Sequence, residues 1–179
     1  MLDLGCGDGE FGLILRTRLK LLEYTVGLDI DVENVRKSKN KYHDVILGDV
    51  RKPPFRDNSF DVVCMFEVLD HLEKRDAIKV LDNLEKLAKR LVILSCPHGS
   101  PRGVREETNI WQRHRSDWFP NELRSKGYKV LGYIPSFIRN LTIPRKFLLV
   151  TLLFPFLPFL RVPAEGSWQL IAYKLLNFT

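Results

Sequence analysis

Alternating glycines directly after a short apolar run constrain the fold of this chain more than any other feature. Residues Met1–Leu4 predict a strand, and glycines follow at positions 5, 7 and 9. Apolar residues at helical spacing then begin at Phe11. Glycine allows a tight turn and lets a bound molecule touch the main chain, and the first N–H groups of the following helix face the same ligand. The pattern therefore predicts a nucleotide-type site at the carboxyl end of a central strand.

The acidic residues around this loop indicate which nucleotide it binds. Together with Gly12, the loop glycines also match the dinucleotide fingerprint, which is a weak signal alone. Asp3, Asp8 and Glu10 would place three carboxylates beside a pyrophosphate. S-adenosylmethionine carries a cationic sulfonium and an ammonium group instead, so the charges favour this methyl donor.

An acidic residue also follows the second predicted strand, Tyr24–Leu28. Asp29 lies twenty positions after Gly9, where a carboxylate can accept hydrogen bonds from both ribose hydroxyls. This spacing serves a dinucleotide and the methyl donor equally well, and the acidic loop decides between them.

Strand and helix patterns alternate through most of the chain, which predicts an α/β fold with a parallel sheet. The predicted strands are Met1–Leu4, Tyr24–Leu28, Val45–Leu47, Phe60–Phe66, Leu91–Cys96, Tyr128–Ile134 and Ser167–Leu175. The predicted helices end at about Leu22 and Asn40, cover about Lys74–Lys89, and cover Asp117–Ser125 with Ser116 as N-cap. A length of 179 residues with 45% hydrophobic residues indicates a single domain, 1–179.

The charge and the cysteines restrict the class of protein. A net charge of +6 comes from scattered Lys and Arg, which favours solvated helix faces over a nucleic-acid patch. The three cysteines lack metal-ligand spacing and indicate reduced thiols in a cytoplasmic protein. Because Met1 already lies inside the first strand, we expect that the true start lies upstream or that the chain is a fragment.

Five motifs within residues 1 to about 97 are specific when taken together. They are Leu2–Gly9, Gly27–Asp29, Gly48–Val50, Pro54–Phe55 with Asp57–Val63, and Glu67–Leu72. With them, the chain resembles the class I S-adenosylmethionine-dependent methyltransferases, in particular the ubiquinone and menaquinone biosynthesis type (methyltransferase type 11). The resemblance implies a Rossmann-like, mostly parallel seven-stranded sheet of order 3-2-1-4-5-7-6, with the last strand antiparallel. The helices that usually precede the first strand of this family and cap the cofactor are missing from this sequence.

The resemblance also implies the residues that bind the cofactor. They are Asp3, Gly5, Cys6, Gly7, Gly9, Asp29, Ile30, Asp49, Val50, Phe66 and Glu67. The loop Gly5–Gly7 would follow the methionine part, Asp29 would hold the ribose, and Asp49 would accept from the exocyclic amine of adenine. No metal site is implied.

The segment after the fifth predicted strand carries the candidate acceptor residues. Asn109 through Trp118 match a string found in relatives of the family, and His114 within it is the predicted catalytic base. A structural role for this histidine is an equal alternative. Trp111 and Trp118 either wall the acceptor pocket or pack the next helix on the sheet. His71 is interpreted as a helix-entry residue without a catalytic duty.

The predicted function is a methyltransferase that acts on a small-molecule or lipid-like acceptor. An RNA or protein methyltransferase is the second interpretation, supported only by the basic isoelectric point of about 9.3. A non-catalytic cofactor-binding subunit is the third. The sequence indicates neither the methylated atom nor the oligomeric state.

A long apolar insertion at about 135–166 separates the last two predicted strands. Its core, Phe147–Leu160, is fourteen residues without a charge, and a helix of that length is too short to span a bilayer. Pro155 and Pro158 would also break such a helix. Two interpretations remain open for 141–161, namely packing on the protein or a second subunit, and peripheral contact with one membrane leaflet. The basic flanks favour the membrane.

Overall fold

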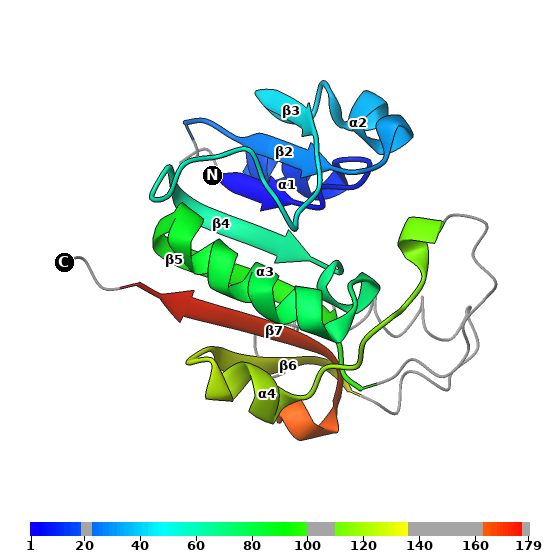
Figure 1. Cartoon of the computed structure of the whole chain (residues 1–179), viewed down its shortest axis with the longest axis vertical. Coiled ribbons are helices and arrows are strands. Elements are labelled where there is room, and N and C mark those ends of the chain that lie inside the picture. The colour runs from blue at the N-terminus through cyan, green and yellow to red at the C-terminus, as the bar shows by residue number, and fades with distance from the viewer. Residues whose placement is uncertain (19–22, 100–109, 136–162, 177–179) are drawn as a thin grey trace.

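The computed structural model describes residues 1–18, 23–99, 110–135 and 163–176, and within them seven strands form one sheet (Figure 1). Its order, β3-β2-β1-β4-β5-β7-β6, is the predicted one. The strands are β1 (Leu2–Leu4), β2 (Val26–Asp29), β3 (Asp44–Leu47), β4 (Phe60–Phe66), β5 (Ala88–Pro97), β6 (Lys129–Pro135) and β7 (Ser167–Leu175). Strands β1 to β5 pair in parallel, and β7 runs antiparallel to both of its neighbours. The expectation for the fold class is confirmed.

The centre of the sheet forms the core of the domain. Leu2 of β1 pairs with Val26 of β2 on one side and with Val63 of β4 on the other, and all three side chains are buried. Apolar residues in continuous runs are typical of strands that are covered on both faces. The short apolar run at the start of the chain therefore becomes the central strand, and the loop that follows it lies at the middle of one sheet edge.

Helices in the connections between these strands cover the sheet (Figure 1). They are α1 (Glu10–Arg18), α2 (Val32–Ser38), α3 (Lys74–Leu87) and α4 (Pro120–Ser125), with 3-10 turns at Leu69–His71, Ile110–Gln112 and Ala164–Gly166. Helix α3 buries Ala77, Leu81 and Leu84 at helical spacing, while its other face stays in solvent. It ends before the predicted Lys89 because Ala88 is already extended and begins β5.

The predicted N-cap of the last helix is wrong. Helix α4 begins at Pro120, and its first turn is closed by the Glu122 carboxylate, which accepts from the N–H of Phe119 at 2.9 Å. Proline suits the first helical position because its missing N–H would have no partner there. Ser116 lies earlier, in the buried part of the loop, where its hydroxyl donates to the Leu69 carbonyl at 3.1 Å and accepts from the indole of Trp118.

The loop before α4 is tied to the carboxyl end of β4. The backbone carbonyl of Asp70, in the turn after β4, accepts from the N–H groups of Arg115 and Ser116 at 2.7 and 3.1 Å. This pairing brings residues 110–118 to the edge where β1, β2 and β4 end, although about forty residues of sequence separate the two segments.

The predicted apolar insertion falls mostly on 136–162, outside the described residues, so both interpretations of 141–161 stay predictions. Among the helices described, none has the length and hydrophobicity needed to cross a membrane.

Candidate functional site

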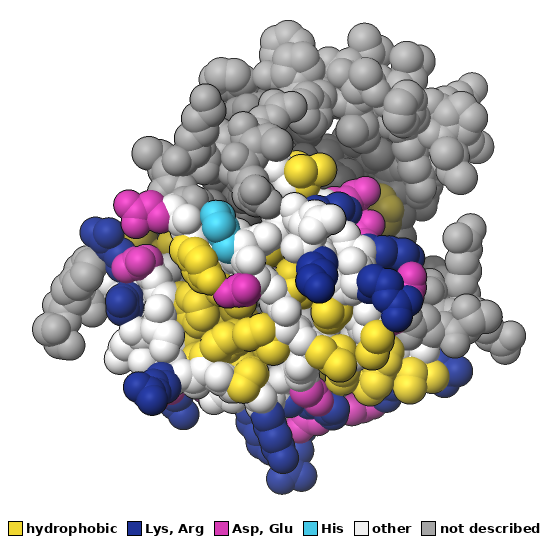
Figure 2. Space-filling view, turned by 90° about the horizontal axis from the view of Figure 1, so that it is seen from above, with side chains coloured by type: hydrophobic (Ala, Val, Ile, Leu, Met, Phe, Trp, Pro, Cys, Tyr) yellow, Lys and Arg dark blue, Asp and Glu magenta, His cyan; other side chains and the backbone are white. Residues whose placement is uncertain are grey.

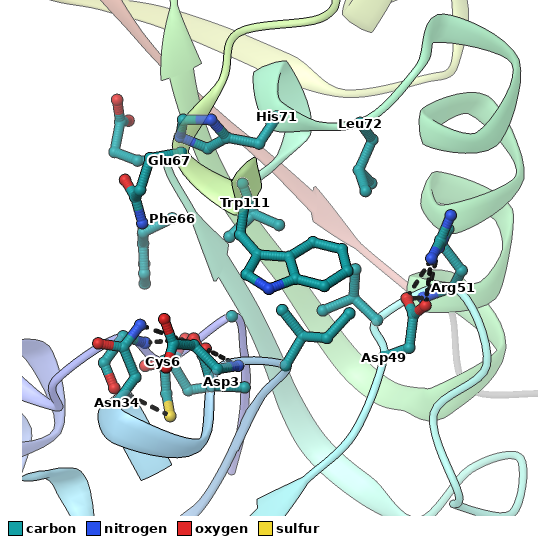
Figure 3. Close-up of a pocket in the computed structure, with 18 of the residues that line it drawn as sticks. Asp3, Cys6, Asn34, Asp49, Arg51, Phe66, Glu67, His71, Leu72 and Trp111 are labelled. Atoms are coloured by element: carbon teal, nitrogen blue, oxygen red, sulfur yellow. Dashed lines mark hydrogen bonds and ion pairs between the residues drawn. The ribbon is translucent and has the colours of Figure 1, made fainter. Parts of the chain in front are cut away.

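A cavity of about 530 Å³ opens at the carboxyl ends of β1, β2 and β4 (Figure 3). A cleft at the point where strand order reverses is where open α/β sheets bind ligands. Ten of the predicted cofactor residues line it: Asp3, Gly5, Cys6, Gly7, Asp29, Ile30, Asp49, Val50, Phe66 and Glu67. Gly9 and His114, which were also predicted for the site, do not line it.

The glycine loop, Gly5–Gly9, has a backbone held by hydrogen bonds, and we call it the cradle. The N–H groups of Gly5 and Cys6 both donate to the carbonyl of Leu28, at 2.7 and 3.0 Å, which holds the loop against the end of β2. Gly5 and Gly7 have φ values of +79° and +55°, a region that side chains disfavour. A Cβ at Gly7 would meet no atom within 4 Å, so the backbone there is open to the cavity.

Gly9 has a packing role in the same loop. Its N–H donates to the carbonyl of Cys6 at 3.0 Å, and a Cβ at this position would lie 2.8 Å from the Cβ of Ser38 in α2. The absence of a side chain therefore lets the loop approach α2 closely. The alternate spacing of the glycines in the sequence gives no sign that the third one faces away from the ligand.

The carboxylate of Asp29 holds the glycine loop in place through hydrogen bonds. Its Oδ2 accepts from the N–H of Gly7 at 2.8 Å, and its Oδ1 accepts from the N–H of Asp31 at 2.9 Å and from the Asn34 amide at 3.3 Å. An ionised carboxylate offers about four acceptor positions, so capacity remains for a hydroxyl in the cavity. The carboxylate predicted to hold the ribose also orients the backbone beside it.

Asp3 differs from the other acidic residues of the loop. Its side chain is buried and accepts from the hydroxyl of Tyr42 at 2.5 Å. Burial raises the pKa of Asp3 to about 7, the hydrogen bond from Tyr42 opposes this shift, and the nearby charge of Asp29 adds to it. Asp8 and Glu10 are exposed at the mouth of the loop, so they contribute the negative field that the sequence predicted.

We expect this buried carboxyl to make the folding stability depend on pH. A pKa raised in the folded state stabilises the fold fully below the ordinary pKa of Asp, 3.8, and this contribution is lost as the pH rises to about 7. The free energy of unfolding should fall by about 1.4 kcal/mol per pH unit across that interval. Asp3→Asn should not show this fall in unfolding free energy, because an amide does not titrate in this pH range. Urea unfolding of both proteins from pH 4.5 to 8 measures the difference, and parallel pH profiles would contradict the assignment.

The adenine side of the predicted site contains an ion pair. The guanidinium of Arg51 contacts both carboxylate oxygens of Asp49, with Nε at 3.0 and 2.9 Å and Nη2 at 2.5 Å from Oδ2. Burial opposes ionisation of Asp49, but these hydrogen bonds and the charge of Arg51 outweigh it, so the pKa of Asp49 is lowered. The adjacent Val50 is buried and supplies an apolar contact. An adenine amine would share Asp49 with Arg51.

Aromatic rings form the opposite wall of the cavity. The rings of Phe11 and Phe66 lie 4.2 Å apart between their centroids. Figure 3 shows the indole of Trp111 projecting into the space between Phe66 and the Asp49–Arg51 pair. Trp118, by contrast, is buried with its indole N–H bonded to Ser116, and it does not line the cavity. The two tryptophans that the sequence could not separate therefore have different roles.

Glu67 carries local backbone strain at the end of β4. Its φ is +53°, which is rare for a residue with a side chain and clusters at functional sites. Its Oε1 accepts from the Ser95 hydroxyl at 2.5 Å. The pKa of Glu67 is raised, chiefly because surrounding protein displaces water, and the bond from Ser95 opposes that shift.

The histidine that lines the cavity is His71, not His114. His114 lies behind it, with 4.8 Å between the centroids of the two rings, and its Nδ1 is 2.7 Å from Oδ2 of buried Asp70. The catalytic role of His114 stays a prediction. His71 was predicted to be a helix-entry residue without a catalytic duty. In the folded chain its Nε2 lies 3.8 Å from Asp70, and the loop of residues 110–118 adds contacts with Arg113 and His114.

The comparisons agree with this architecture. Residues 2–95 match the methyltransferase domain family, which is more than half of the chain. Over 98% of its length the structure superposes on a S-adenosylmethionine-dependent methyltransferase from Archaeoglobus fulgidus, covering 85% of that chain, with a TM-score of 0.67 and 16% identity. At that identity the likeness concerns the fold.

Two curated relatives match over shorter stretches of sequence. A demethylmenaquinone methyltransferase of Thermotoga maritima is 27% identical over 149 residues, which is 80% of this chain and 64% of the relative. An uncharacterised protein of Methanocaldococcus jannaschii is 34% identical over 88 residues, which is 48% of this chain and 32% of the relative. The chain thus spans less than two thirds of either relative. By the family match and the sheet order, it belongs to the methyltransferase domain family, within the S-adenosylmethionine-dependent class.

Proposed function

We propose that the protein transfers a methyl group from S-adenosylmethionine to a small-molecule or lipid-like acceptor. The observation that carries the proposal is the cavity at the end of β1, where a glycine cradle, a ribose-type carboxylate and an aromatic wall meet. The donor supplies a methyl group on a cationic sulfur when it is bound.

The residues present fit this donor. At Gly7 the open backbone leaves room for a ligand against the main chain, because even a Cβ would find empty space there. Asp29 has spare acceptor capacity beside that backbone, and exposed Asp8 and Glu10 favour a cationic ligand over a pyrophosphate. The cradle would therefore bind and orient the donor, and the aromatic wall would exclude water from it.

The aromatic wall supports an apolar or aromatic acceptor. Phe66, Trp111 and Leu72 line the same cavity as the cradle, so an acceptor held against them would lie beside the donor site. Holding two reactants in line is worth a large part of the barrier in such displacements, and little further chemistry is needed from the protein. The demethylmenaquinone methyltransferase named above supports an acceptor of the quinone type.

The charge distribution favours this acceptor class over nucleic acid. On the face that Figure 2 shows, Lys and Arg side chains are dispersed and acidic side chains lie among them. Several basic side chains are also paired with carboxylates, for example Lys126 with Asp82 and Lys174 with Glu85. A nucleic-acid footprint normally gathers unpaired cations on one surface.

Transfer of a labelled methyl group tests the proposal. The full-length protein is incubated with methyl-tritiated S-adenosylmethionine and, in separate reactions, a demethylated quinol, total RNA and a protein extract. Label is expected in the organic phase of the quinol reaction. Label in RNA or protein would overturn the acceptor class, and label in no fraction, with the donor bound, would favour a non-catalytic binding subunit.

A further inference from the structure

Two histidines and a carboxylate meet beside the cavity. Oδ2 of Asp70 lies 2.7 Å from Nδ1 of His114 and 3.8 Å from Nε2 of His71. One nitrogen or oxygen from each of the three residues lies within 4.8 Å of the other two. Asp70 and His71 lie in the turn after β4, and His114 lies in the loop of residues 110–118. The cluster therefore forms only in the folded chain.

Asp70 is the unusual member of this cluster. Its side chain is only 2% exposed, yet neither carboxylate oxygen makes a hydrogen bond with the part of the chain that the structure describes. Nδ1 of His114 is also without a hydrogen bond there, although it lies so close to Asp70. Buried polar atoms are almost always satisfied, and a buried carboxylate without a partner costs several kcal/mol. The Asp70 carboxylate and Nδ1 of His114 are therefore close together without the geometry of a hydrogen bond.

The orientation of His71 is fixed by a backbone group. Its Nδ1 lies 3.2 Å from the carbonyl oxygen of Arg113. A carbonyl can only accept, so Nδ1 carries the proton, and the lone pair of a neutral ring is on Nε2, the nitrogen nearer to Asp70. Metal-binding histidines are typically held by such a bond from their other nitrogen.

We propose that Asp70, His71 and His114 bind a divalent transition-metal cation. Two imidazole nitrogens and one carboxylate form a donor set that suits zinc and its first-row neighbours, whereas magnesium and calcium prefer oxygen alone. Ligand atoms around a tetrahedral zinc are roughly 3.3 Å apart. The two distances to Asp70, 2.7 and 3.8 Å, lie on either side of that value, and the three ligand atoms all lie within 4.8 Å of one another.

The position of the cluster gives the cation a route of entry. His71 lines the cavity and its side chain is 17% exposed, while that of His114 is 31% exposed. Three protein ligands leave at least one coordination position for a ligand from the cavity, as in catalytic rather than structural zinc sites. The cation would also neutralise the buried charge of Asp70.

Direct metal binding tests this inference independently of methyl transfer. The metal-stripped full-length protein is titrated with Zn²⁺ by calorimetry and with Co²⁺ by visible absorption, and thermal unfolding is recorded with and without each metal. One cation per chain is expected to bind, with nitrogen-ligand bands in the Co²⁺ spectrum and a higher Tm with metal. Asp70→Asn and His114→Gln are each expected to weaken binding more than about 100-fold.

His43→Gln serves as the matched control, because His43 is bonded to Thr25 at the other end of the sheet and should leave metal binding unchanged. Asp70→Asn also alters the 2.7 Å contact with His114, so thermal unfolding without metal shows whether this variant stays folded. The proposal is overturned if the parent binds neither cation, or if Zn²⁺ binding survives both substitutions.

Discussion

Replacing Asp29 by alanine is expected to weaken binding of S-adenosylmethionine roughly 5- to 150-fold, which corresponds to about 1–3 kcal/mol. Two losses add together. The ribose hydroxyls would lose a charged acceptor, and the N–H of Gly7, which donates to Asp29 at 2.8 Å, would lose the bond that orients the cradle. The dissociation constant of S-adenosylmethionine, measured by calorimetry for the parent and the variant, gives the effect directly.

Glu33→Ala is the control for this prediction. Glu33 is an exposed carboxylate in α2 that does not line the cavity, and it pairs with Arg36 at 2.9 Å. Its loss removes a negative charge of the same kind without touching the cavity wall, so cofactor affinity should stay within about twofold. Equal weakening in both variants would mean that Asp29 acts only through the general field of the loop.

Two alanine substitutions in the cradle should separate folding from ligand binding. Gly7→Ala places a methyl group in open space, so the folded state should lose only the cost of a positive φ, about 1–2 kcal/mol. Cofactor affinity should nevertheless fall about 10- to 150-fold, because the methyl group occupies room that the ligand needs. Chemical unfolding and calorimetry on the same samples report the two effects.

Gly5→Ala should give the opposite pattern. Its new Cβ would lie 2.3 Å from Cγ2 of Val68, a stiff β-branched side chain, so we expect a loss of roughly 2–5 kcal/mol in unfolding free energy. The double variant with Val68→Ala should recover part of that stability by removing the clash. If Gly7→Ala unfolds the protein while Gly5→Ala leaves it stable, the geometry of the cradle is misassigned.

Most of the sheet could be predicted from the sequence because its strands are continuous apolar runs punctuated by glycine or an acidic residue. The run Phe60–Phe66 and the last strand, Ser167–Leu175, have the predicted bounds. Asp29 could also be placed, because the end of a parallel strand fixes where a side chain meets the site. Local pattern and burial determine these features together.

The features that the sequence left open depend on contacts between distant segments. Trp111 and Trp118 have the same local signal, and only the pairing of the Asp70 carbonyl with the returning loop places one in the cavity and the other in the core. The same pairing turns Ser116 from a predicted helix cap into a buried hydrogen-bonding residue. Arg51, two positions from Asp49, gave no sign that it would occupy both carboxylate oxygens.

Competitive calorimetry on the full-length protein tests the central claim, that the cavity at the end of β1 binds the methyl donor. S-adenosylmethionine and S-adenosylhomocysteine should each bind one molecule per chain in the micromolar range or tighter, and each should displace the other. NAD should produce no measurable heat, because the exposed Asp8 and Glu10 oppose a pyrophosphate at the cradle. Tight binding of NAD with no heat from either methyl-donor compound would contradict the assignment of the site.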